Sequence, residues 1–407
     1  MDSAAVTRLT RDRVRFLVAA LAITTTVGYG VLTYAFSALL GPMSAELSIS
    51  TSTAVGASTV AVLVSALMSI PVGRRLDAGG GRGLMSGGSV LAAFAVLGWS
   101  QVQNVVQLYA VFVLLGIASA MVLYPPAFAV VVAVAAPAAR NTSILTITMV
   151  GGLASSIFIP LTGYLAHTLG WRTALVVLAG TVAVITVPLH LFAVPRRPRG
   201  PGGSRPAKSP ARVLRDAGFW LLAGEFVVHS GGLAVISVHL VLYLVSLGHP
   251  PARAASLAGL LGLLSVTGRL VASVSARWLP MATITALIVF CQGVAVALLP
   301  AVGRHVGGAI GCLVLFGLGF GVSSVALPAI LLDRYGATGF GTIAGMIGTP
   351  ATIAKAVGPL GGAGLAEAFG YRPLMFTVAA GCVAAALALV LSRRVRAPAS
   401  ATEPLTM

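Results

Sequence analysis

The sequence predicts an all-α membrane protein with twelve transmembrane helices in two pseudo-symmetric six-helix bundles. Of its 407 residues, 57% are hydrophobic and only 9% are charged, whereas soluble domains carry about 25% charged residues. Mean hydropathy is +0.99. Twelve apolar stretches each approach the ~20 residues that a spanning helix needs. They begin near Phe16, Ser52, Leu84, Val105, Thr142, Thr173, Phe219, Ala254, Ala282, Val306, Thr342 and Leu374.

Basic residues predict the orientation of these helices. With both termini on one side of the membrane, that side holds all but six of the 26 Lys and Arg residues. The exceptions are Arg172, Arg253, Arg304 and Arg372 on the opposite side, and Arg269 and Lys355 inside predicted spans. By the positive-inside rule both termini are cytoplasmic. We therefore expect a multi-pass protein of the plasma membrane, specifically a bacterial inner membrane.

The net charge of +17 would suit a nucleic-acid-binding protein, but its confinement to one membrane side explains it as topology. We expect no nucleic-acid partner. The first apolar stretch, of about 25 residues, is too long for a signal peptide. The three cysteines lie far apart in apolar stretches and indicate no disulfide framework. No cluster has catalytic or metal-ligand spacing, so we expect no enzyme activity, cofactor or metal.

Two halves of the chain repeat each other. The segment 160–172 contains Pro-Leu-Thr-Gly and then Gly-Trp-Arg, and the segment 359–372 contains Pro-Leu-Gly-Gly and then Gly-Tyr-Arg. A Pro/Gly/Arg-rich segment at 195–215 divides the chain between them. The predicted organisation is a bundle over residues 1–194, a cytoplasmic linker over 195–215 and a second bundle over 216–407. Internal repeats of this kind are typical of secondary transporters.

The loop after the second span carries Gly73, Asp77 and Arg82 in the run Gly-Arg-Arg-Leu-Asp-Ala-Gly-Gly-Gly-Arg. This run resembles the G-x-x-x-D-x-x-G-R signature of the major facilitator superfamily, with the Gly-Arg pair displaced by one position. The resemblance extends along the whole chain and implies a cytoplasmic gate held by these residues. Asp77 could bind the N–H groups of a helix N-terminus or an Arg side chain; the alternative is a solvated basic turn. The second copy of the motif keeps only Arg277, since Ala276 replaces the Asp.

Arg269 and Lys355 are the most informative residues, because a cation at the bilayer centre costs about 2.5–3.5 kcal/mol on insertion scales. Arg269 lies eight residues before Arg277, about 12 Å of helix rise. Lys355 lies twelve residues before Glu367, about 18 Å. Both therefore approach the midplane. The pair resembles the monocarboxylate and oxalate/formate branch, which implies that they bind substrate carboxylates. Arg269 could instead bond the carbonyls of a broken helix or pair with Glu225, as a structural strut.

Four further residues are candidates inside the spans. Tyr29 and Tyr124 are polar aromatics, and Tyr124 precedes Pro125-Pro126, which predicts a helix break. His239 is a candidate for substrate contact, and Glu225, the only acid within a predicted span, for proton coupling. Packing alone explains any of these as well.

The sequence favours a secondary active transporter of small organic anions, mono- or dicarboxylates, working by alternating access as a symporter or antiporter. Expected partners are the anion, the lipid bilayer and either protons or a counter-anion, and the protein is expected to be monomeric. The alternative is proton-driven efflux of drugs or other amphiphiles. Such exporters usually place acids in the membrane core of the first bundle, where this chain has none.

Overall fold

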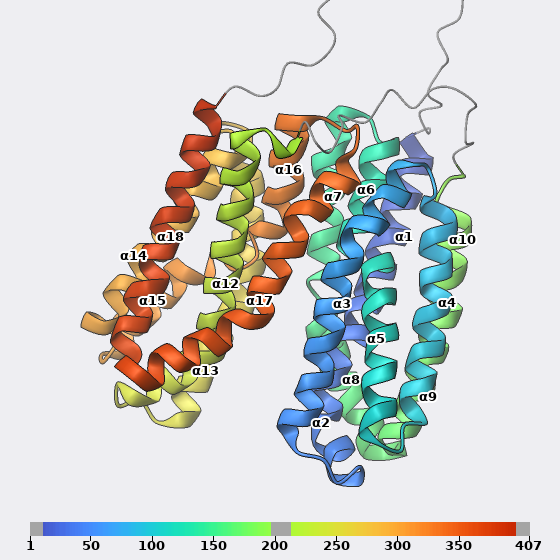
Figure 1. Ribbon diagram of the computed structural model, residues 1–407, viewed down its shortest axis with the longest axis horizontal. Helices are drawn as coiled ribbons and strands as arrows, with labels where there is room; N and C mark the ends of the chain where they lie inside the picture. The colour runs from blue at the N-terminus through green and yellow to red at the C-terminus, as the bar shows by residue number, and fades with distance from the viewer. Residues whose placement is uncertain (1–10, 197–212, 396–407) are drawn as a thin grey trace, which may run out of the picture. The chain divides into compact units, whose positions relative to one another are not determined.

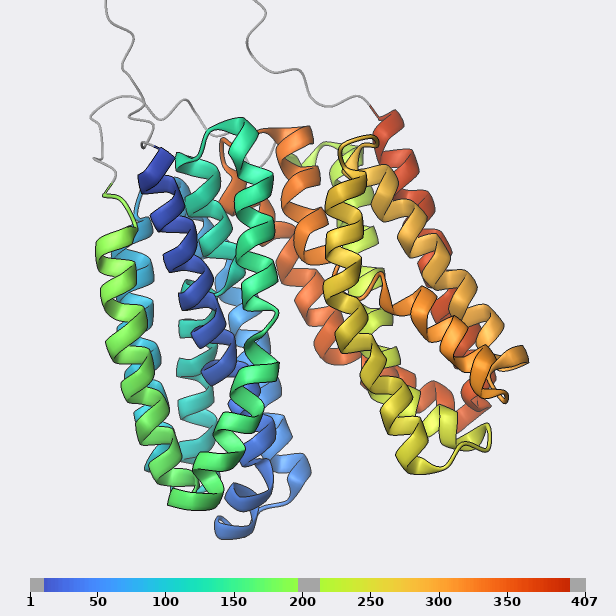
Figure 2. The same ribbon diagram turned by 180° about the vertical axis from the view of Figure 1, so that it is seen from behind.

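The computed structural model describes residues 11–196 and 213–395, and within these ranges every regular element is a helix, with no strand (Figures 1 and 2). The predicted all-α fold is confirmed. The helices of the first half are α1 (Arg11–Tyr29), α2 (Ala35–Glu46), α3 (Thr51–Asp77), α4 (Gly81–Ser100), α5 (Val105–Val122), α6 (Tyr124–Val134), α7 (Pro137–Gly151), α8 (Ala154–Leu169), α9 (Trp171–Thr181) and α10 (Val187–Ala193). Those of the second half are α12 (Ala217–Ser246), α13 (Pro251–Ser275), α14 (Met281–Val302), α15 (Val306–Gly317), α16 (Ser323–Tyr335), α17 (Phe340–Phe369) and α18 (Tyr371–Arg394).

Among the described residues, ten helices or runs of consecutive helices are long and apolar enough to cross a membrane. The other two predicted spans are helical but depart from that standard for local reasons. One is interrupted, because α15 ends at Gly317 and α16 begins at Ser323. The other, α17, has 30 residues but is diluted by glycine and threonine. The chain is a multi-pass membrane protein, since every predicted span coincides with a helix or a run of helices.

Residue contacts divide the chain into two units. The first comprises Met1–Arg205 and Gly339–Ala356, and the second comprises Pro206–Thr338 and Val357–Met407. This division differs from the predicted bundles in one segment, because α17 begins in the first unit and ends in the second. Residues 197–212 of the predicted linker lie outside the described residues. The predicted boundary at 195–215 therefore stays a prediction.

The core of the first unit forms around Trp99 of α4. Its ring lies edge-on to Phe112 of α5, with centroids 5.0 Å apart, and its Nε1 donates to Met43 Sδ at 3.2 Å. Helices α3, α4 and α5 run side by side (Figure 1). Aromatic packing of this kind stabilises a helix bundle through van der Waals contact.

Breaks interrupt several spans of the first unit. A π-helical turn (Gly30–Tyr34) follows α1, at a point where a Cβ on Gly30 would lie 2.2 Å from the Phe158 ring. Leu123 is extended between α5 and α6, immediately before the Pro125-Pro126 pair, so the predicted break is confirmed. Such breaks are tolerated at membrane depth only where protein or a polar cavity surrounds them.

The core of the second unit lies between α12, α14 and α18, with α13 packed on α15. Tyr243, Met375 and Leu389 are among its fully buried side chains. The interruption between α15, which ends at Gly317, and α16, which begins at Ser323, is the irregular feature of this unit.

A buried ion pair fastens three helix ends of the second unit. Asp216, the N-cap of α12, accepts from Arg334 Nη2 at 2.9 Å and from Tyr335 Oη at 2.7 Å. Arg334 also donates to the carbonyl of Ser392 in α18 at 2.8 Å. Burial alone would raise the pKa of Asp216, but the hydrogen bonds from Arg334, Tyr335 and the Gly218 N–H outweigh it and hold that pKa below its usual value.

Replacing Asp216 by Asn should lower the thermal unfolding midpoint in detergent, through a loss of about 1.5–3 kcal/mol. Because the folded pKa of Asp216 is lowered, its stabilisation is complete above the unfolded pKa of about 4 and disappears as pH falls through the folded value. The difference between variant and wild type should therefore shrink on acidification. Asp12, whose ion pair with Arg15 is exposed, provides the control: Asp12→Asn should change stability by less than about 0.5 kcal/mol. Equal losses in the two variants would contradict this account.

Candidate functional site

The Asp77 carboxylate binds the N-terminus of α17. Its Oδ1 accepts from the Gly341 N–H at 2.9 Å, and its Oδ2 accepts from the Thr342 N–H at 2.7 Å and from the Thr342 hydroxyl at 2.6 Å. A carboxylate at this position satisfies orphan N–H groups and complements the positive end of the helix dipole. Of the two predicted partners for Asp77, the structure contains the helix N-terminus. Its role as a gate stays a prediction.

Small residues bring α3 and α17 into backbone contact within the first unit. A Cβ on Gly73 would lie 2.2 Å from the Gly341 carbonyl oxygen, and one on Gly345 would lie 2.7 Å from the Ser69 carbonyl oxygen. Further along, the Thr349 hydroxyl donates to the Ala66 carbonyl at 2.8 Å. We call this antiparallel contact the α3–α17 seam. Its α17 residues were not predicted, although Gly341-x-x-x-Gly345 is a recognisable close-packing motif.

Neither of the two predicted gate arginines takes part in the contacts of the seam. Arg82 is half-buried in the first turn of α4, and its Nε is buried with no hydrogen-bond partner among the described residues. Arg277 is exposed directly after α13, in the second unit. Neither forms an ion pair with Asp77 in the described part of the chain.

Lys355 lies in α17, one residue before the point where this helix leaves the first unit. Its side chain is exposed, and within residues 11–196 and 213–395 it has no hydrogen-bond or ion-pair partner. Pro359, four residues later, has no N–H to offer the Lys355 carbonyl. The structure therefore leaves the Lys355 ammonium available to other groups.

Arg269 contacts the interruption between α15 and α16. Its Nε donates to the Gly321 carbonyl at 3.2 Å, and its Nη2 donates to Ser265 Oγ at 3.2 Å. Glycines permit this approach: a Cβ on Gly268 would lie 1.7 Å from the Leu318 carbonyl oxygen. The alternative predicted for Arg269, bonding to the carbonyls of a broken helix, describes this contact. Neither residue was predicted: the contact with Gly321 is tertiary, whereas Ser265 lies one helical turn before Arg269 and could have been found from spacing.

Glu225 is fully buried in α12, and both carboxyl oxygens lack a hydrogen-bond partner among the described residues. Its Oε1 lies 3.7 Å from Nδ1 of His229, one turn further along the helix. His229 Nε2 lies 2.8 Å from Gln292 Oε1 on α14, and His229 Nδ1 lies 3.1 Å from Ser323 Oγ on α16. This polar cluster joins the predicted coupling residue to partners that sequence spacing does not reveal.

His239 forms a hydrogen bond within the second unit. Its Nε2 lies 3.0 Å from the Pro359 carbonyl oxygen of α17, and only 6% of the residue is exposed. A Cβ on Gly362 would lie 3.3 Å from the same ring nitrogen. Because a carbonyl oxygen can only accept, Nε2 carries the hydrogen in this contact. This geometry favours fastening of α17 to α12, and substrate contact by His239 stays a prediction.

Tyr29 and Tyr124 meet in the first unit. Their ring centroids are 4.6 Å apart, and Tyr124 stacks on Phe128 with centroids 5.3 Å apart. The Tyr124 hydroxyl donates to the Thr148 carbonyl at 3.3 Å. The two tyrosines, both half-buried, thus form one aromatic surface rather than two separate contacts.

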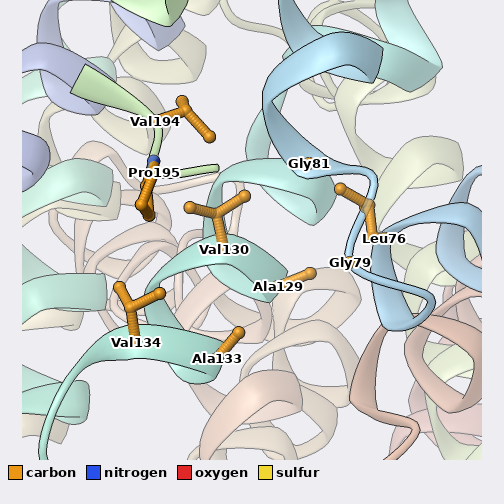
Figure 3. A pocket seen from close by; sticks show the side chains of 9 residues that line it. All are labelled: Leu76, Gly79, Gly81, Ala129, Val130, Ala133, Val134, Val194 and Pro195. Atoms are coloured by element: carbon orange, nitrogen blue, oxygen red, sulfur yellow. The ribbon is translucent and has the colours of Figure 1, made fainter. Parts of the chain in front are cut away.

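An apolar pocket of the first unit contains none of the predicted substrate residues (Figure 3). Its wall includes Leu76, Val130 and Val194, and it borders Gly79 and Gly81 of the loop between α3 and α4. It is small, and its lining of Leu, Gly, Ala, Val and Pro residues offers no polar side chain for an anion. It is packing space beside the loop.

These features define a polytopic helical membrane protein with a buried polar cluster and, at predicted mid-membrane depth, a cation that has no partner among the described residues. The family model of the Major Facilitator Superfamily matches residues 20–359, which is more than half of the chain. The chain belongs to this superfamily. The narrower resemblance to the monocarboxylate and oxalate/formate branch stays a prediction, because the superfamily match does not distinguish branches.

A curated relative and several solved structures are similar to the chain. An MFS-type efflux pump of Mycolicibacterium smegmatis is 34% identical over 179 residues, which is 43% of this chain and 40% of that protein. The match thus spans less than half of that relative's length.

The solved structures share the fold at low identity. The human organic anion transporter TETRAN is 15% identical, with a TM-score of 0.71 over 94% of this chain and 100% of that one. The proton:xylose symporter XylE bound to 6-bromo-6-deoxy-D-glucose is 11% identical, with a TM-score of 0.73 over 93% and 95%. The E. coli fucose:proton symporter FucP is 12% identical, with a TM-score of 0.72 over 92% and 98%.

Proposed function

We propose that this protein is a secondary transporter of small organic anions, with Lys355 as a principal carboxylate-binding group. The supporting observation is the Lys355 side chain, which is exposed and has no partner in the described ranges although the sequence predicts it at mid-membrane depth. An uncompensated cation there is expensive and so indicates function. An organic carboxylate is the simplest species that compensates it during transport.

Arg269 is the second proposed carboxylate ligand. Arg binds carboxylates bidentately, while Lys acts as a compact point charge, so the two together suit a dicarboxylate or a carboxylate with a second polar group. In the described state Arg269 donates to Gly321 and Ser265. Binding an anion would exchange these neutral acceptors for a charged one, which forms stronger hydrogen bonds. The aromatic surface of Tyr29 and Tyr124 is the proposed apolar contact of the first unit.

The fold itself carries no information about the substrate, because one fold can hold binding sites for many different functions.

A direct test of the proposed substrate class uses ligand-induced stabilisation of the purified protein, since a ligand of the folded state raises the unfolding midpoint. We expect lactate or oxalate to stabilise the protein, and the isosteric amides lactamide and oxamide to have no effect. Stabilisation by the amides alone would exclude recognition through the carboxylate charge.

Efflux of amphiphilic compounds is the second candidate, supported by the similarity to the mycobacterial efflux pump. It predicts stabilisation by lipophilic cations such as tetraphenylphosphonium. The buried polar groups of the second unit are compatible with either function, whereas the partnerless Lys355 would repel a cationic drug. The charge of Lys355 thus favours the anion.

We propose the α3–α17 seam, which contains Asp77 and Gly73, as the cytoplasmic gate, and Arg82 and Arg277 remain proposed gate residues. The supporting observation is the triple hydrogen bond of Asp77 to Gly341 and Thr342. A contact built from one carboxylate and glycine backbones can separate and re-form without repacking large side chains. That property suits a contact that alternates during transport.

Cysteine labelling tests the proposed orientation, with both termini in the cytoplasm. In a background with Cys291, Cys312 and Cys382 replaced, Gly203→Cys should react with an impermeant maleimide only from the cytoplasmic side. Gly303→Cys, after α14, should react only from outside. The reason is the positive-inside rule, since all but six of the 26 Lys and Arg residues lie with the termini. Labelling of Gly203→Cys from outside in intact cells would reverse the orientation.

A further inference from the structure

The turn that follows α2 in the first unit and the turn that follows α12 in the second have the same backbone structure. The two helices end at Glu46 and Ser246, and two residues later each turn has a positive φ, of 52° at Ser48 and 102° at Gly248. Three backbone hydrogen bonds join residues at the same spacings in both turns. Ser246 of the second unit therefore corresponds to Glu46 of the first, so a neutral side chain replaces a carboxylate.

The Glu46 carboxylate of the first unit binds the start of α9. Its Oε2 accepts from Trp171 Nε1 at 2.5 Å, and its Oε1 accepts from Arg172 Nε at 2.7 Å. The other two guanidinium nitrogens of Arg172 donate to the carbonyls of Ser100 and Val102, at the end of α4, each at 2.7 Å. The aromatic and arginine pair at this helix start is thus a complete carboxylate site, occupied by a side chain of the protein itself.

The corresponding start of α18 has no such carboxylate. Tyr371 and Arg372 follow a glycine with a φ of 84°, just as the bound pair of α9 follows one with a φ of 80°. Ser246 carries no charge, and its hydroxyl donates to a backbone carbonyl of its own helix at 2.7 Å. The end of the neighbouring helix α14 is contacted by another residue, since His249 Nε2 lies 2.7 Å from the Gly303 carbonyl oxygen. Arg372 therefore lacks both kinds of contact that its counterpart makes in the first unit.

Three hydrogen-bond donors at the start of α18 have no acceptor within residues 11–196 and 213–395. They are the Arg372 guanidinium and the hydroxyls of Tyr371 and Tyr243. The Tyr243 hydroxyl is buried, and the ring centroids of the two tyrosines are 5.7 Å apart. The Arg372 charge is close enough to this hydroxyl to act on it electrostatically. Glu367, the acid nearest to Arg372 in the sequence, is exposed and forms no ion pair in the described chain. Buried polar groups are seldom left unpaired, so this cluster indicates an acceptor from outside the chain.

We propose that Tyr243, Tyr371 and Arg372 form a carboxylate-binding site, where a small organic carboxylate takes the place that Glu46 fills in the first unit. The guanidinium offers a planar fork of donors, and the two hydroxyls can donate to the same anion. The N-terminus of α18 has no side-chain cap, and its positive end adds to the attraction. Because Arg372 is exposed, solvent weakens binding here relative to the proposed mid-membrane cations. Use of this site for entry of the transported anion rests on the proposed function; carboxylate binding does not.

Arginine modification by phenylglyoxal, followed by peptide mass spectrometry, tests the site without transport. Oxalate at ten times its Kd occupies about nine-tenths of the sites, so Arg372 should then react about tenfold more slowly. Oxamide, or sodium chloride at the same ionic strength, should give no protection. Arg253 and Arg304 are exposed near helix ends of the same unit and should react at unchanged rates with oxalate. An unchanged rate at Arg372 at every oxalate concentration would exclude the site.

Two substitutions test the correspondence between the units. Ser246→Glu should supply the missing acid, so Arg372 should react slowly even without oxalate, whereas the neutral control Ser246→Gln should behave as wild type. Tyr243→Phe removes only the buried hydroxyl and should raise the oxalate concentration needed for protection about tenfold. Wild-type reactivity of Arg372 in both Ser246→Glu and Tyr243→Phe would overturn the proposal.

Uptake kinetics in proteoliposomes separate the binding site from its use in transport. If the site serves entry, Arg372→Gln should raise the KM for lactate and oxalate and leave the maximal rate unchanged, and Arg253→Gln should change neither. An unchanged KM in Arg372→Gln would exclude the entry role alone. If oxalate protects Arg372 but no carboxylate is transported by wild type, the proposed function fails while the binding site stands.

Discussion

Replacing Lys355 by Gln weakens carboxylate affinity about 10- to 100-fold, if Lys355 binds the substrate as proposed. A charge-assisted hydrogen bond contributes about 1.5–3 kcal/mol, and each 1.4 kcal/mol is a tenfold change in affinity. Lys355 has no partner in the described chain, so its removal breaks no internal contact, and the protein should unfold at the same or a higher temperature, because a costly unpaired charge is removed. Isothermal titration with lactate and oxalate measures the affinity.

Replacing Arg269 should affect both affinity and stability, because this residue is a proposed carboxylate ligand and also makes a hydrogen bond within the protein. Arg269→Gln should weaken carboxylate affinity by a similar factor. It should also lower the thermal unfolding midpoint, because the hydrogen bond to the Gly321 carbonyl is lost. Arg269→Lys keeps the charge and should still be weakened, because the bidentate geometry is lost. Either substitution should weaken the binding of a dicarboxylate. The binding of a monocarboxylate should be weakened less by Lys355→Gln than by Arg269→Gln.

The chain provides controls for both cations. Lys208 is the only other lysine and lies in the predicted linker, so Lys208→Gln removes the same charge far from the spans. Arg253 is exposed near the start of α13, the helix that carries Arg269. Both control variants should bind as wild type. Unchanged affinity in Lys355→Gln and in Arg269→Gln, with folding intact, would remove the basis for an anion site.

A methyl group on Gly73 should separate the α3–α17 seam. The added Cβ would lie 2.2 Å from the Gly341 carbonyl oxygen, and backbone atoms on both sides leave no flexible side chain to yield. Thr342 and Gly341 would then lose their bonds to Asp77. We expect Gly73→Ala to expose the seam and to reduce carboxylate transport at least tenfold, because the proposed gate no longer closes.

Cysteine accessibility measures that separation directly. Ala66 is 1% exposed, and its carbonyl accepts from Thr349 in the seam. A cysteine at Ala66 should therefore react with maleimide at least tenfold faster in the Gly73→Ala background. Gly348→Ala is the matched control, since a Cβ on Gly348 of α17 meets nothing within 4 Å. An equal reaction rate in the Gly73→Ala and Gly348→Ala backgrounds would show that the seam tolerates the methyl group.

Local sequence signals predicted the spans, the break before α6 and the importance of Asp77. The length of an apolar stretch and the position of a helix breaker are local properties, so both can be read from a single sequence. The contact of Arg269 with Gly321 could not be located the same way, although a broken helix was anticipated as its partner. It depends on close approach at Gly268, a tertiary property.

The buried cluster shows the same limit of local reasoning. Glu225 stands out in the sequence as an acid within a span, yet its neighbour His229 is contacted by groups from two other helices, α14 and α16. Gln292 is 63 residues from His229 and reaches it only because α12, α14 and α16 belong to one folded unit. Helical spacing alone places His229 one turn from Glu225. It does not reveal the hydrogen bonds from other helices that determine the His229 tautomer. The assignment of α17 to both units likewise depends on packing rather than on the composition of the helix.

Equilibrium counterflow in proteoliposomes tests the central claim, transport of organic anions, most directly. Proteoliposomes loaded with unlabelled lactate or oxalate and diluted into the labelled anion should accumulate label transiently in wild type, and at least tenfold more slowly in Lys355→Gln. Preloading with lactamide or tetraphenylphosphonium should give no accumulation of labelled carboxylate. Counterflow of labelled tetraphenylphosphonium without any counterflow of a carboxylate would contradict the claim and establish efflux of amphiphiles instead.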